Sequence, residues 1–496
     1  MSAWPRYPSI YEINTRVWLE RVGRGVGRTV TLATVPLYEW DAIAGVGCDA
    51  IWLMGVWDRS PAGKGIANQN TVLLDAFHRT LPDFQLQDNI GSAYCIRRYV
   101  VDEALGGPDG LSAARRVLAA RGVRLVLDFV PNHVAPDHPW VGQHPEYFLH
   151  GSEAERSAAP ASFIESGGHT LACGRDPYFA PWPDVLQLNA FSSQLRGAAR
   201  NTLREIAEQC DAVRCDMAML MLNAVFARTW GLRAGAVPAT EYWQELIAPI
   251  VAERPDFRFL AEAYWDLEWT LQQLGFHWCY DKRLYDRLRG NDAGAIRVHL
   301  GAAAAYQDRL LRFIENHDEP RAAAVFAAPK AMAAAVTGLT LPGARLIHDG
   351  QIQGRAVQLP VFLRREPFET PNPTTILFYR HLLAATRDDV FRHGHWRLCE
   401  SSGWPDNGSC EYLLAWGWAQ AADGPLRFLI VVNFSDVRSQ GCVHLGCGMS
   451  GASWRLSDCL TDAVFERSGD ELDERGLYVD LPPWGSHFLR ISGSHA

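Results

Sequence analysis

The stretch Asp211–Met219, DAVRCDMAM, decides how the fold of this chain is interpreted. In a strand, its alternation puts Arg214 and Asp216 on one face and the apolar residues between them on the other. A charged pair at i and i+2 at the end of an apolar run suits a strand whose end carries chemistry. The same pair is also typical of a structural ion pair near a core, so this stretch alone leaves both interpretations open.

Three other apolar runs also end in a carboxylate, and strand-like and helix-like segments alternate around them. The runs are LVLDFVPNH (Leu125–His133), FLAEAYW (Phe259–Trp265) and FIENHDEPR (Phe313–Arg321). The eight expected strands lie within residues 9–18, 48–57, 123–133, 211–218, 257–265, 276–282, 311–318 and 344–351. Eight strand and helix units in alternation are what a (β/α)8 TIM barrel requires, so the sequence predicts this α/β fold.

The alternation is interrupted in three places. Between residues 134 and 183 Pro, His, Gly and aromatic residues take over, which predicts an inserted subdomain after the third strand. From residue 391 short alternating strands without helices predict a C-terminal antiparallel β domain, a β-sandwich over 391–496. The barrel then comprises 1–133 and 184–390. Residues 58–99, rich in Gly, Asn and Asp, are expected to form an extended loop after the second strand.

Composition and charge narrow the classes of partner. With 496 residues, 48% of them hydrophobic, the chain can bury a large core and form more than one domain. The formal net charge of −9 comes without a basic block, which argues against nucleic-acid and membrane partners and favours a small uncharged one. Residues 1–18 lack the apolar core of a signal peptide, and no apolar run could span a bilayer, so we expect a cytoplasmic protein.

The 11 cysteines are scattered singly along the chain. Because their number is odd and no CxxC pair occurs, we expect buried free thiols rather than disulfides or metal ligands. The sequence therefore predicts no metal site.

In a TIM barrel the chemistry lies at the carboxyl ends of the strands. The carboxylates that fall at those ends are Asp128, Asp216, Glu262 and Asp318, on strands three, four, five and seven. Two carboxylates on the neighbouring strands four and five can lie roughly 5 Å apart, the separation expected of a retaining glycosidase. A cation site is the alternative that these residues alone leave open.

Four stretches resemble a known family. DFVPNH, AVRCDMA, FLAEAYW and ENHDEPR, in this order and with a long insertion after the first, resemble the signature stretches of the α-amylase family, glycoside hydrolase family 13. The resemblance extends over nearly the whole chain, including CDAIWLMGV at strand two, LPGARLIHDGQ at strand eight and the final β domain. It implies a retaining enzyme for α-glucosidic bonds, with Asp216 as nucleophile, Glu262 as acid and base, and Asp318 holding the distorted sugar.

The resemblance also implies a set of substrate-binding residues, namely Arg214, His133, His317, Tyr94, Asp128 and Asn132. The arginine would fix the nucleophile in its ionised form, the histidines would bond to hydroxyls of the sugar in the −1 subsite, and the tyrosine would stack on that sugar. The third-strand aspartate and asparagine would support the site. Each has a packing alternative, since such histidines and loop tyrosines often only pack, and Asp128 could serve the backbone or Arg214 alone.

Four positions depart from the family pattern. Met219 and Leu220 stand where members acting on long starch chains often carry Lys and His, which implies an apolar acceptor side. Cys95 replaces the acidic residue after the stacking tyrosine, and Gln351 stands where many members have Glu. We therefore expect small α-glucosides or oligosaccharides rather than polymeric starch as substrates. No cofactor is predicted, and calcium is not predicted because its site in secreted members relies partly on backbone oxygens.

The sequence thus predicts a retaining α-glycosidase that works by double displacement. The alternative is an α-glucosyl transferase or isomerase of the trehalose- or sucrose-active type, in which a sugar hydroxyl replaces water. A catalytically inactive barrel that serves as a binding or scaffold subunit is the rival from another class. The complete set of Asp216, Glu262, Asp318 and Arg214 argues against that rival. A small carbohydrate is the expected partner, and the sequence specifies no oligomeric state.

Overall fold

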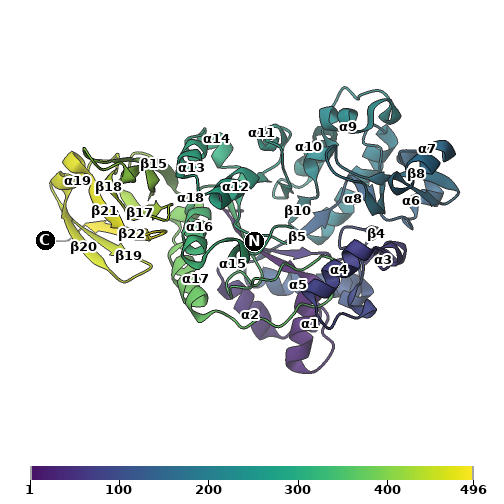
Figure 1. Cartoon of the computed structure of the whole chain (residues 1–496), viewed down its shortest axis with the longest axis horizontal. Helices are drawn as coiled ribbons and strands as arrows, with labels where there is room; N and C mark the ends of the chain where they lie inside the picture. The colour runs from purple at the N-terminus through teal and green to yellow at the C-terminus, as the bar shows by residue number, and fades with distance from the viewer. Residues whose placement is uncertain (1–2, 494–496) are drawn as a thin grey trace. The chain divides into compact units, whose positions relative to one another are not determined.

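The computed structural model describes residues 3–493 (Figure 1). Eight of its strands close into a barrel in the order β1-β14-β13-β12-β11-β10-β5-β2. Seven of these strands lie within their expected regions, and β13 begins one residue before its region. The eight strands are β1 (Ser9–Asn14), β2 (Ala50–Met54), β5 (Arg124–Phe129), β10 (Ala212–Cys215), β11 (Arg258–Ala261), β12 (Trp278–Tyr280), β13 (Leu310–Arg312) and β14 (Ala344–His348). Neighbouring strands pair in parallel, for example β2 with β5 and β10 with β11. The predicted TIM barrel is confirmed.

The chain forms two compact units, which are described separately. The first holds Tyr11–Tyr280 and Val357–Phe368, and the second holds Trp4–Ile10, Asp281–Ala356 and the chain from Glu369 onward.

The first unit contains the helices that follow the early barrel strands, and two of them, α1 and α8, begin at side-chain caps. They include α1 (Thr15–Val26), α2 (Leu37–Gly45), α5 (Gly107–Ala119), α8 (Ser193–Gln209), α9 (Asn223–Trp230), α10 (Tyr242–Glu253) and α11 (Glu268–Gln273). The Ser192 hydroxyl accepts the Leu195 N–H at the start of α8, and the Asn14 side chain does the same for Val17 in α1. These helices follow strands as the sequence pattern predicts.

The segment after β2 is not the extended loop that the sequence predicts. It contains β3 (Trp57–Arg59), α3 (Pro61–Ala67), α4 (Thr71–Thr80) and β4 (Ile96–Val101), and β3 pairs with β4. Ser60 and Asn70 cap the two helices, and Pro61 suits the first helical turn. Phe77 and Phe84 then pack into a small apolar cluster with Leu363, which gives this segment a core of its own.

The insertion forms a small sheet in the first unit. Its strands are β6 (His133–Val134), β9 (Trp182–Gln187), β8 (His169–Gly174) and β7 (Phe163–Ser166), in that order, and α7 (Glu153–Ala158) lies between β6 and β7 in the sequence. An apolar cluster that includes Val134, Phe148, Leu171 and Leu186 packs within it. Because His133 pairs with Gln187, the sheet begins immediately beyond the end of β5. The boundaries 134–183 stay a prediction.

In the second unit, helices accompany the last barrel strands and an antiparallel sheet follows. The helices include α12 (Lys282–Gly290), α13 (Ala293–Leu300), α16 (Ala328–Thr340) and α17 (Pro373–Ala385). The sheet has the order β20-β19-β22-β17-β16-β15-β18-β21, with β15 (His395–Ser402), β16 (Leu413–Ala419), β17 (Leu426–Asn433), β18 (Ser439–His444), β19 (Ser453–Asp458), β20 (Val464–Ser468), β21 (Leu477–Leu481) and β22 (Ser486–Gly493). One half of β15 pairs with β16 and the other with β18, so the sheet curls.

Two features of the second unit qualify the sequence analysis. The predicted C-terminal antiparallel β domain is confirmed, although a short helix, α19 (Gly469–Arg475), interrupts its strands. Trp416 and Trp418 of β16 donate their indole N–H groups to the hydroxyl and carbonyl of Thr340, which fasten the sheet to α16. The domain boundary at residue 391 stays a prediction.

The cysteines are free thiols, and several, including Cys95, Cys173, Cys215 and Cys279, are buried. Within residues 3–493, none of the helices has the length and apolar character needed to cross a membrane.

Candidate active site

The register of the central strands aligns charged side chains in layers. Arg214 on β10 lies opposite Asp128 on β5 and Leu260 on β11. In-register neighbours of a parallel sheet face the same side, which brings the Arg214 Nη1 within 3.8 Å of the Asp128 Oδ1. Asp216 and Glu262 are each two residues further along their strands and therefore share the next layer on the same face.

The backbone ladder continues into that second layer. The Asp216 N–H donates to the Phe129 carbonyl, and the Glu262 N–H donates to the Cys215 carbonyl. These bonds hold the two carboxylate-bearing residues immediately beyond the ends of β10 and β11. Their positions are thus fixed by the barrel itself rather than by a loop.

Arg214 joins the two carboxylates. Its Nη1 lies 2.6 Å from Asp216 Oδ1, its Nη2 forms an ion pair at 2.7 Å with Glu262 Oε2, and its Nε donates to the Tyr280 hydroxyl. Burial disfavours the charged guanidinium, but Glu262, Tyr94, Tyr280 and Asp216 outweigh burial and hold the pKa of Arg214 well above its usual value. Arg214 is therefore a fixed positive charge beneath both carboxylates.

Glu262 receives two further donors. The Tyr264 hydroxyl donates to its Oε1 at 2.9 Å, and the Met217 N–H donates to its Oε2 at 2.6 Å. Met217 itself has a left-handed backbone, with φ of 42°, which turns the chain sharply after Asp216.

Asp128 supports the site from the side of β2. Its oxygens accept the Trp52 indole N–H at 3.2 Å and the Gly55 N–H at 3.1 Å, and its carbonyl accepts the Trp57 indole N–H. The Arg214 guanidinium lies over the Trp52 ring, 5.3 Å from its centroid. Asp128 thus joins β2 to β5 beside Arg214.

His133, Asn132 and Tyr94 form a second group. Burial lowers the pKa of His133 to about 4, although its hydrogen bond to the Tyr94 backbone opposes this shift, so the imidazole is neutral near pH 7. Gln187 of the insertion donates to both the carbonyl and the side-chain oxygen of Asn132. The Arg214 guanidinium lies 5.0 Å from the Tyr94 ring centroid, which brings this group beside the ion-paired one.

His317 and Asp318 belong to the second unit and follow β13. The His317 Nε2 lies 2.9 Å from Asp318 Oδ2, and His317 is buried while the Asp318 side chain is 43% exposed. The Asn316 side chain accepts the backbone N–H groups of Asp318 and Glu319, which shapes the turn that presents Asp318. The roles of all the predicted site residues stay predictions.

The residues that depart from the family pattern are buried or hydrogen-bonded within the protein. Met219 and Leu220 lie in a short 3-10 turn and are 0% and 2% exposed, so the prediction that Met219 faces the acceptor is wrong. Met219 is buried because apolar side chains among Leu and Ala usually pack into the core. The Cys95 thiol donates to the Asp184 carbonyl, and Gln351 donates to the Tyr379 hydroxyl.

Sequence reasoning did not identify Tyr264 and Trp52, which bind the carboxylates, or Tyr280, which binds Arg214. Tyr264 stands two residues after Glu262, so a same-face search from that carboxylate would have found it. Tyr280 ends β12, and no sequence spacing links it to Arg214. Trp52 donates across from β2, and only the strand order reveals that contact.

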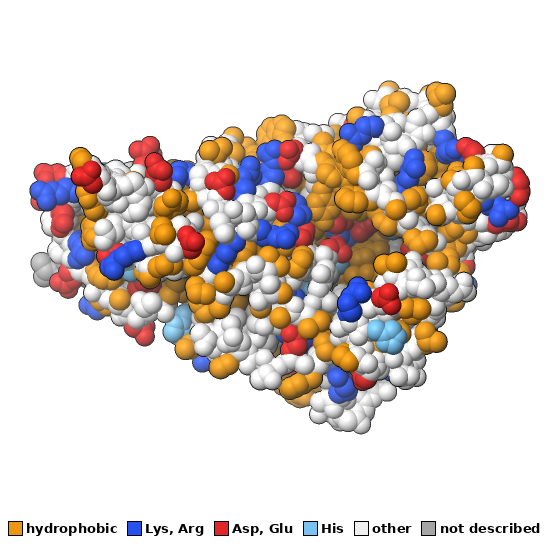
Figure 2. All heavy atoms as spheres, viewed as in Figure 1, with side chains coloured by type: hydrophobic (Ala, Val, Ile, Leu, Met, Phe, Trp, Pro, Cys, Tyr) orange, Lys and Arg blue, Asp and Glu red, His pale blue; other side chains and the backbone are white. Residues whose placement is uncertain are grey.

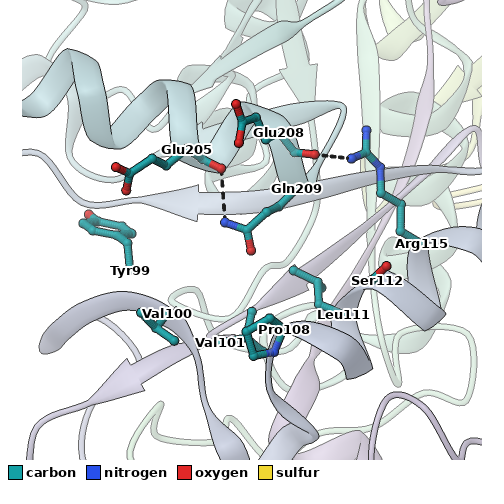
Figure 3. Close-up of a pocket in the computed structure, with 10 residues that line it drawn as sticks. All are labelled: Tyr99, Val100, Val101, Pro108, Leu111, Ser112, Arg115, Glu205, Glu208 and Gln209. Atoms are coloured by element: carbon teal, nitrogen blue, oxygen red, sulfur yellow. Dashed lines mark hydrogen bonds between the residues drawn. The ribbon is translucent and has the colours of Figure 1, made fainter.

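The surface is hollowed near β10, and acidic side chains appear at the bottom of the hollow among apolar ones (Figure 2). A separate cavity of about 430 Å³ lies among β4, α5 and α8 (Figure 3). Its polar groups largely satisfy one another, because Gln209 donates to the Glu205 carbonyl and Arg115 donates to the Glu208 carbonyl. None of the predicted site residues lines that cavity.

Among the residues that the structure describes, no group of three or more His, Cys, Asp or Glu side chains is arranged to hold a metal ion. The absence of a metal and of any cofactor from the function stays a prediction.

A closed parallel barrel with ion-paired carboxylates beyond its strand ends is the architecture of a barrel enzyme. No protein-family model matches the chain. The α-amylase MalA of Haloarcula japonica is 25% identical over 363 residues, which cover 71% of this chain and 45% of the relative. The α-1,4-glucan:maltose-1-phosphate maltosyltransferase 2 of Streptomyces coelicolor is 27% identical over 213 residues, which cover 42% of this chain and 26% of the relative. The chain spans less than half the length of these curated relatives.

A solved structure extends the similarity to the whole chain at the level of the fold. The maltogenic α-amylase AmyB of Thermotoga neapolitana superposes with a TM-score of 0.70 and 17% identity over 99% of both chains. The resemblance to the α-amylase family is thus confirmed, and the curated relatives carry the names of glycoside hydrolases and of a transferase.

Proposed function

We propose that the protein is a retaining α-glycosidase that cleaves α-glucosidic bonds of small α-glucosides or oligosaccharides by double displacement. One observation carries the proposal: Asp216 and Glu262 occupy the same layer on neighbouring parallel strands, joined by Arg214. Neighbouring strands are about 4.8 Å apart, which suits the roughly 5–5.5 Å carboxyl separation of retaining enzymes better than the wider gap of inverting ones.

In the proposed mechanism Asp216 attacks the anomeric carbon while Glu262 gives its proton to the leaving oxygen. Glu262 then removes a proton from water as the water oxygen attacks the anomeric carbon and the bond to Asp216 breaks, which releases the sugar with its α configuration restored. The proposal requires Glu262 to carry a proton when substrate is bound, and a substrate that competes for Arg214 would favour that protonated form. Asp318 and His317 would hold the sugar ring, and the neutral His133 would bond to a hydroxyl.

Transfer is the second candidate, because a relative is named a maltosyltransferase. In that case a sugar hydroxyl would take the place of water, as in an α-glucosyl transferase or isomerase. The free thiols fit a reducing compartment, and a cytoplasmic location is part of the proposal.

Proton NMR of the first turnovers tests the proposal. Maltose, maltotriose, sucrose, trehalose, isomaltose and starch are offered in turn, and the anomer released first is expected to be α. Early appearance of the β-anomer would show a single displacement and would remove Asp216 from the nucleophile role. Products larger than the substrate would favour transfer over hydrolysis.

A further inference from the structure

The loop that carries His317 and Asp318 is closed at its base by a buried ion pair. Arg321 Nη1 lies 2.6 Å from Glu315 Oε1, and the Ala322 N–H donates to Glu315 Oε2 at 2.7 Å. These contacts join the two ends of the loop through one carboxylate. Glu315 and Arg321 are 1% and 6% exposed, whereas the Asp318 side chain between them is 43% exposed. The frame of the loop is thus buried, while the residue that it presents is accessible.

The same arginine ties the loop to the end of β14, the strand that pairs with β13. Arg321 Nη1 also donates to the Asp349 carbonyl at 2.8 Å and lies 2.8 Å from His348 Nδ1. The Gln351 side chain accepts the His348 N–H and donates to the Tyr379 hydroxyl of α17. Groups that follow both strands therefore hold the arginine in place.

The ion pair is charged although it is buried. Burial raises the pKa of the Glu315 carboxyl, but Arg321 and His348 outweigh burial and hold that pKa below its usual value. Water cannot replace a lost partner in such a pair, so each charge fixes the position of the other. Apolar side chains of similar volume often stabilise a fold as well as a buried ion pair does. A defined geometry of the loop is thus what the pair adds beyond stability.

A separate set of contacts shapes the turn inside the loop. The Asn316 side chain accepts the N–H groups of Asp318 and Glu319, and the Glu319 carboxylate lies 3.2 Å from Lys282 Nζ of α12. These contacts set the local direction of Asp318. The ion pair at the base of the loop sets where the whole turn stands relative to β13 and β14.

We infer that Glu315 and Arg321 are positioning residues, which hold Asp318 where it contacts hydroxyls of the bound sugar. The inference rests on the proposed function, in which Asp318 holds the sugar ring. Hydrogen bonds to sugar hydroxyls that strengthen in the transition state supply part of the catalysis by glycoside hydrolases. Such contacts are sensitive to position, since a displacement of about 1 Å can cost about a hundredfold in rate. Because Glu315 and Arg321 are buried, their effect passes through Asp318.

A double-mutant cycle with Asp318 separates positioning from stability. Glu315→Gln removes the charge but keeps an acceptor for the Ala322 N–H. In the otherwise wild-type protein it should lower kcat for α-glucosyl fluoride about tenfold and change KM less than about twofold. In Asp318→Asn the same substitution should cost less than about twofold more, because the group that it positions is already impaired. Equal losses in both backgrounds, or an effect on KM alone, would overturn the inference.

A second variant and a second substrate serve if Glu315→Gln does not fold or Asp318→Asn is inactive. Glu315→Gln/Arg321→Met removes both charges together, which usually costs little stability, and it should show the same loss of kcat. The ratio of kcat/KM for α-glucosyl fluoride to that for its 2-deoxy analogue measures the contacts of the 2-hydroxyl. This ratio should fall at least about threefold in the double variant, and an unchanged ratio would refute the positioning role.

A matched control comes from another buried ion pair of the same unit. Asp458→Asn removes the partner of His487 in the C-terminal sheet, so it should lower stability and leave kcat within about twofold of wild type. A loss of kcat in this control as large as that in Glu315→Gln would show that destabilisation alone is responsible, and would overturn the inference. If the wild-type protein cleaves no α-glucoside, the proposed function fails, whereas additive losses in an active protein overturn only the positioning role.

Discussion

Asp184, near the start of the strand β9, is expected to make the stability of the protein depend on pH. The residue is 9% exposed, and burial raises the pKa of its carboxyl from 3.8 to about 6. The folded protein therefore holds this proton more tightly than the unfolded chain does. The contribution of Asp184 to stability is full below about pH 3.8, is lost as pH rises to about 6, and stays lost above that.

The size of this effect follows from the two pKa values. They differ by about two pH units, and at about 1.4 kcal/mol per unit the charged carboxylate costs about 3 kcal/mol above pH 6. Asp184→Asn keeps the shape and removes the charge. We expect it to raise the free energy of unfolding by up to about 3 kcal/mol at pH 8 and to change it little at pH 4.

Urea unfolding followed by tryptophan fluorescence at pH 4, 6 and 8 measures this difference. Asp75→Asn, on the exposed face of α4, serves as the control and should change stability little at any of these pH values. A gain from Asp184→Asn that is the same at pH 4 and pH 8, or a loss at pH 8, would refute the reasoning. Activity on any accepted α-glucoside should be nearly unchanged, because Asp184 has no role in the proposed chemistry.

Three further predictions concern the site. Because burial lowers the pKa of His133 from 6.5 to about 4, its contribution to stability is full above about pH 6.5 and falls by up to about 3 kcal/mol as pH drops to about 4. In His133→Gln the urea midpoint should therefore decrease less over that range, and an unchanged slope would contradict this. Arg214→Met leaves buried carboxylates without their cation and should lower the free energy of unfolding by about 3–5 kcal/mol and abolish activity. Arg214→Lys should retain part of that stability when unfolding is measured by calorimetry. Equal stabilities of the two variants would argue against the ion-pair account. Glu262→Gln should slow maltose far more than an activated aryl α-glucoside, which scarcely needs protonation, and similar losses on both would count against Glu262 as the acid.

The barrel strands could be predicted because most of their residues are apolar, as in strands that are buried on both faces. Every residue of β2, β5, β10 and β14 is buried, and such runs, bounded by turn residues and separated by helical patterns, are the signature of a parallel sheet. The carboxylates at the strand ends could be predicted for the same reason. Once a buried strand is recognised, the polar residues that follow its last buried position mark its carboxyl end.

The helices between β3 and β4 could not be predicted in this way. In α4 only Phe77 is fully buried, with Leu73 and Leu74 partly buried beside it, so the apolar stripe is short and the helix also depends on its cap at Asn70 and on packing with the distant Leu363. The position of Met219 was mispredicted because a short turn, rather than a strand or helix period, decides which way it faces. The contact of Tyr178 with Trp265 joins two loops, and no local pattern indicates it.

The sharing of one guanidinium by Asp128, Asp216 and Glu262 has a consequence for inhibitors. One positive charge does not balance three carboxylates, so the floor of the site favours a positively charged ring over a neutral one. A protonated imino sugar should therefore bind more tightly than the uncharged carbocyclic analogue of the same shape. For the same reason, the site should bind the sugar cation that develops while the glycosidic bond breaks more tightly than it binds the neutral sugar. Because the cluster is buried, salt should screen this preference only weakly.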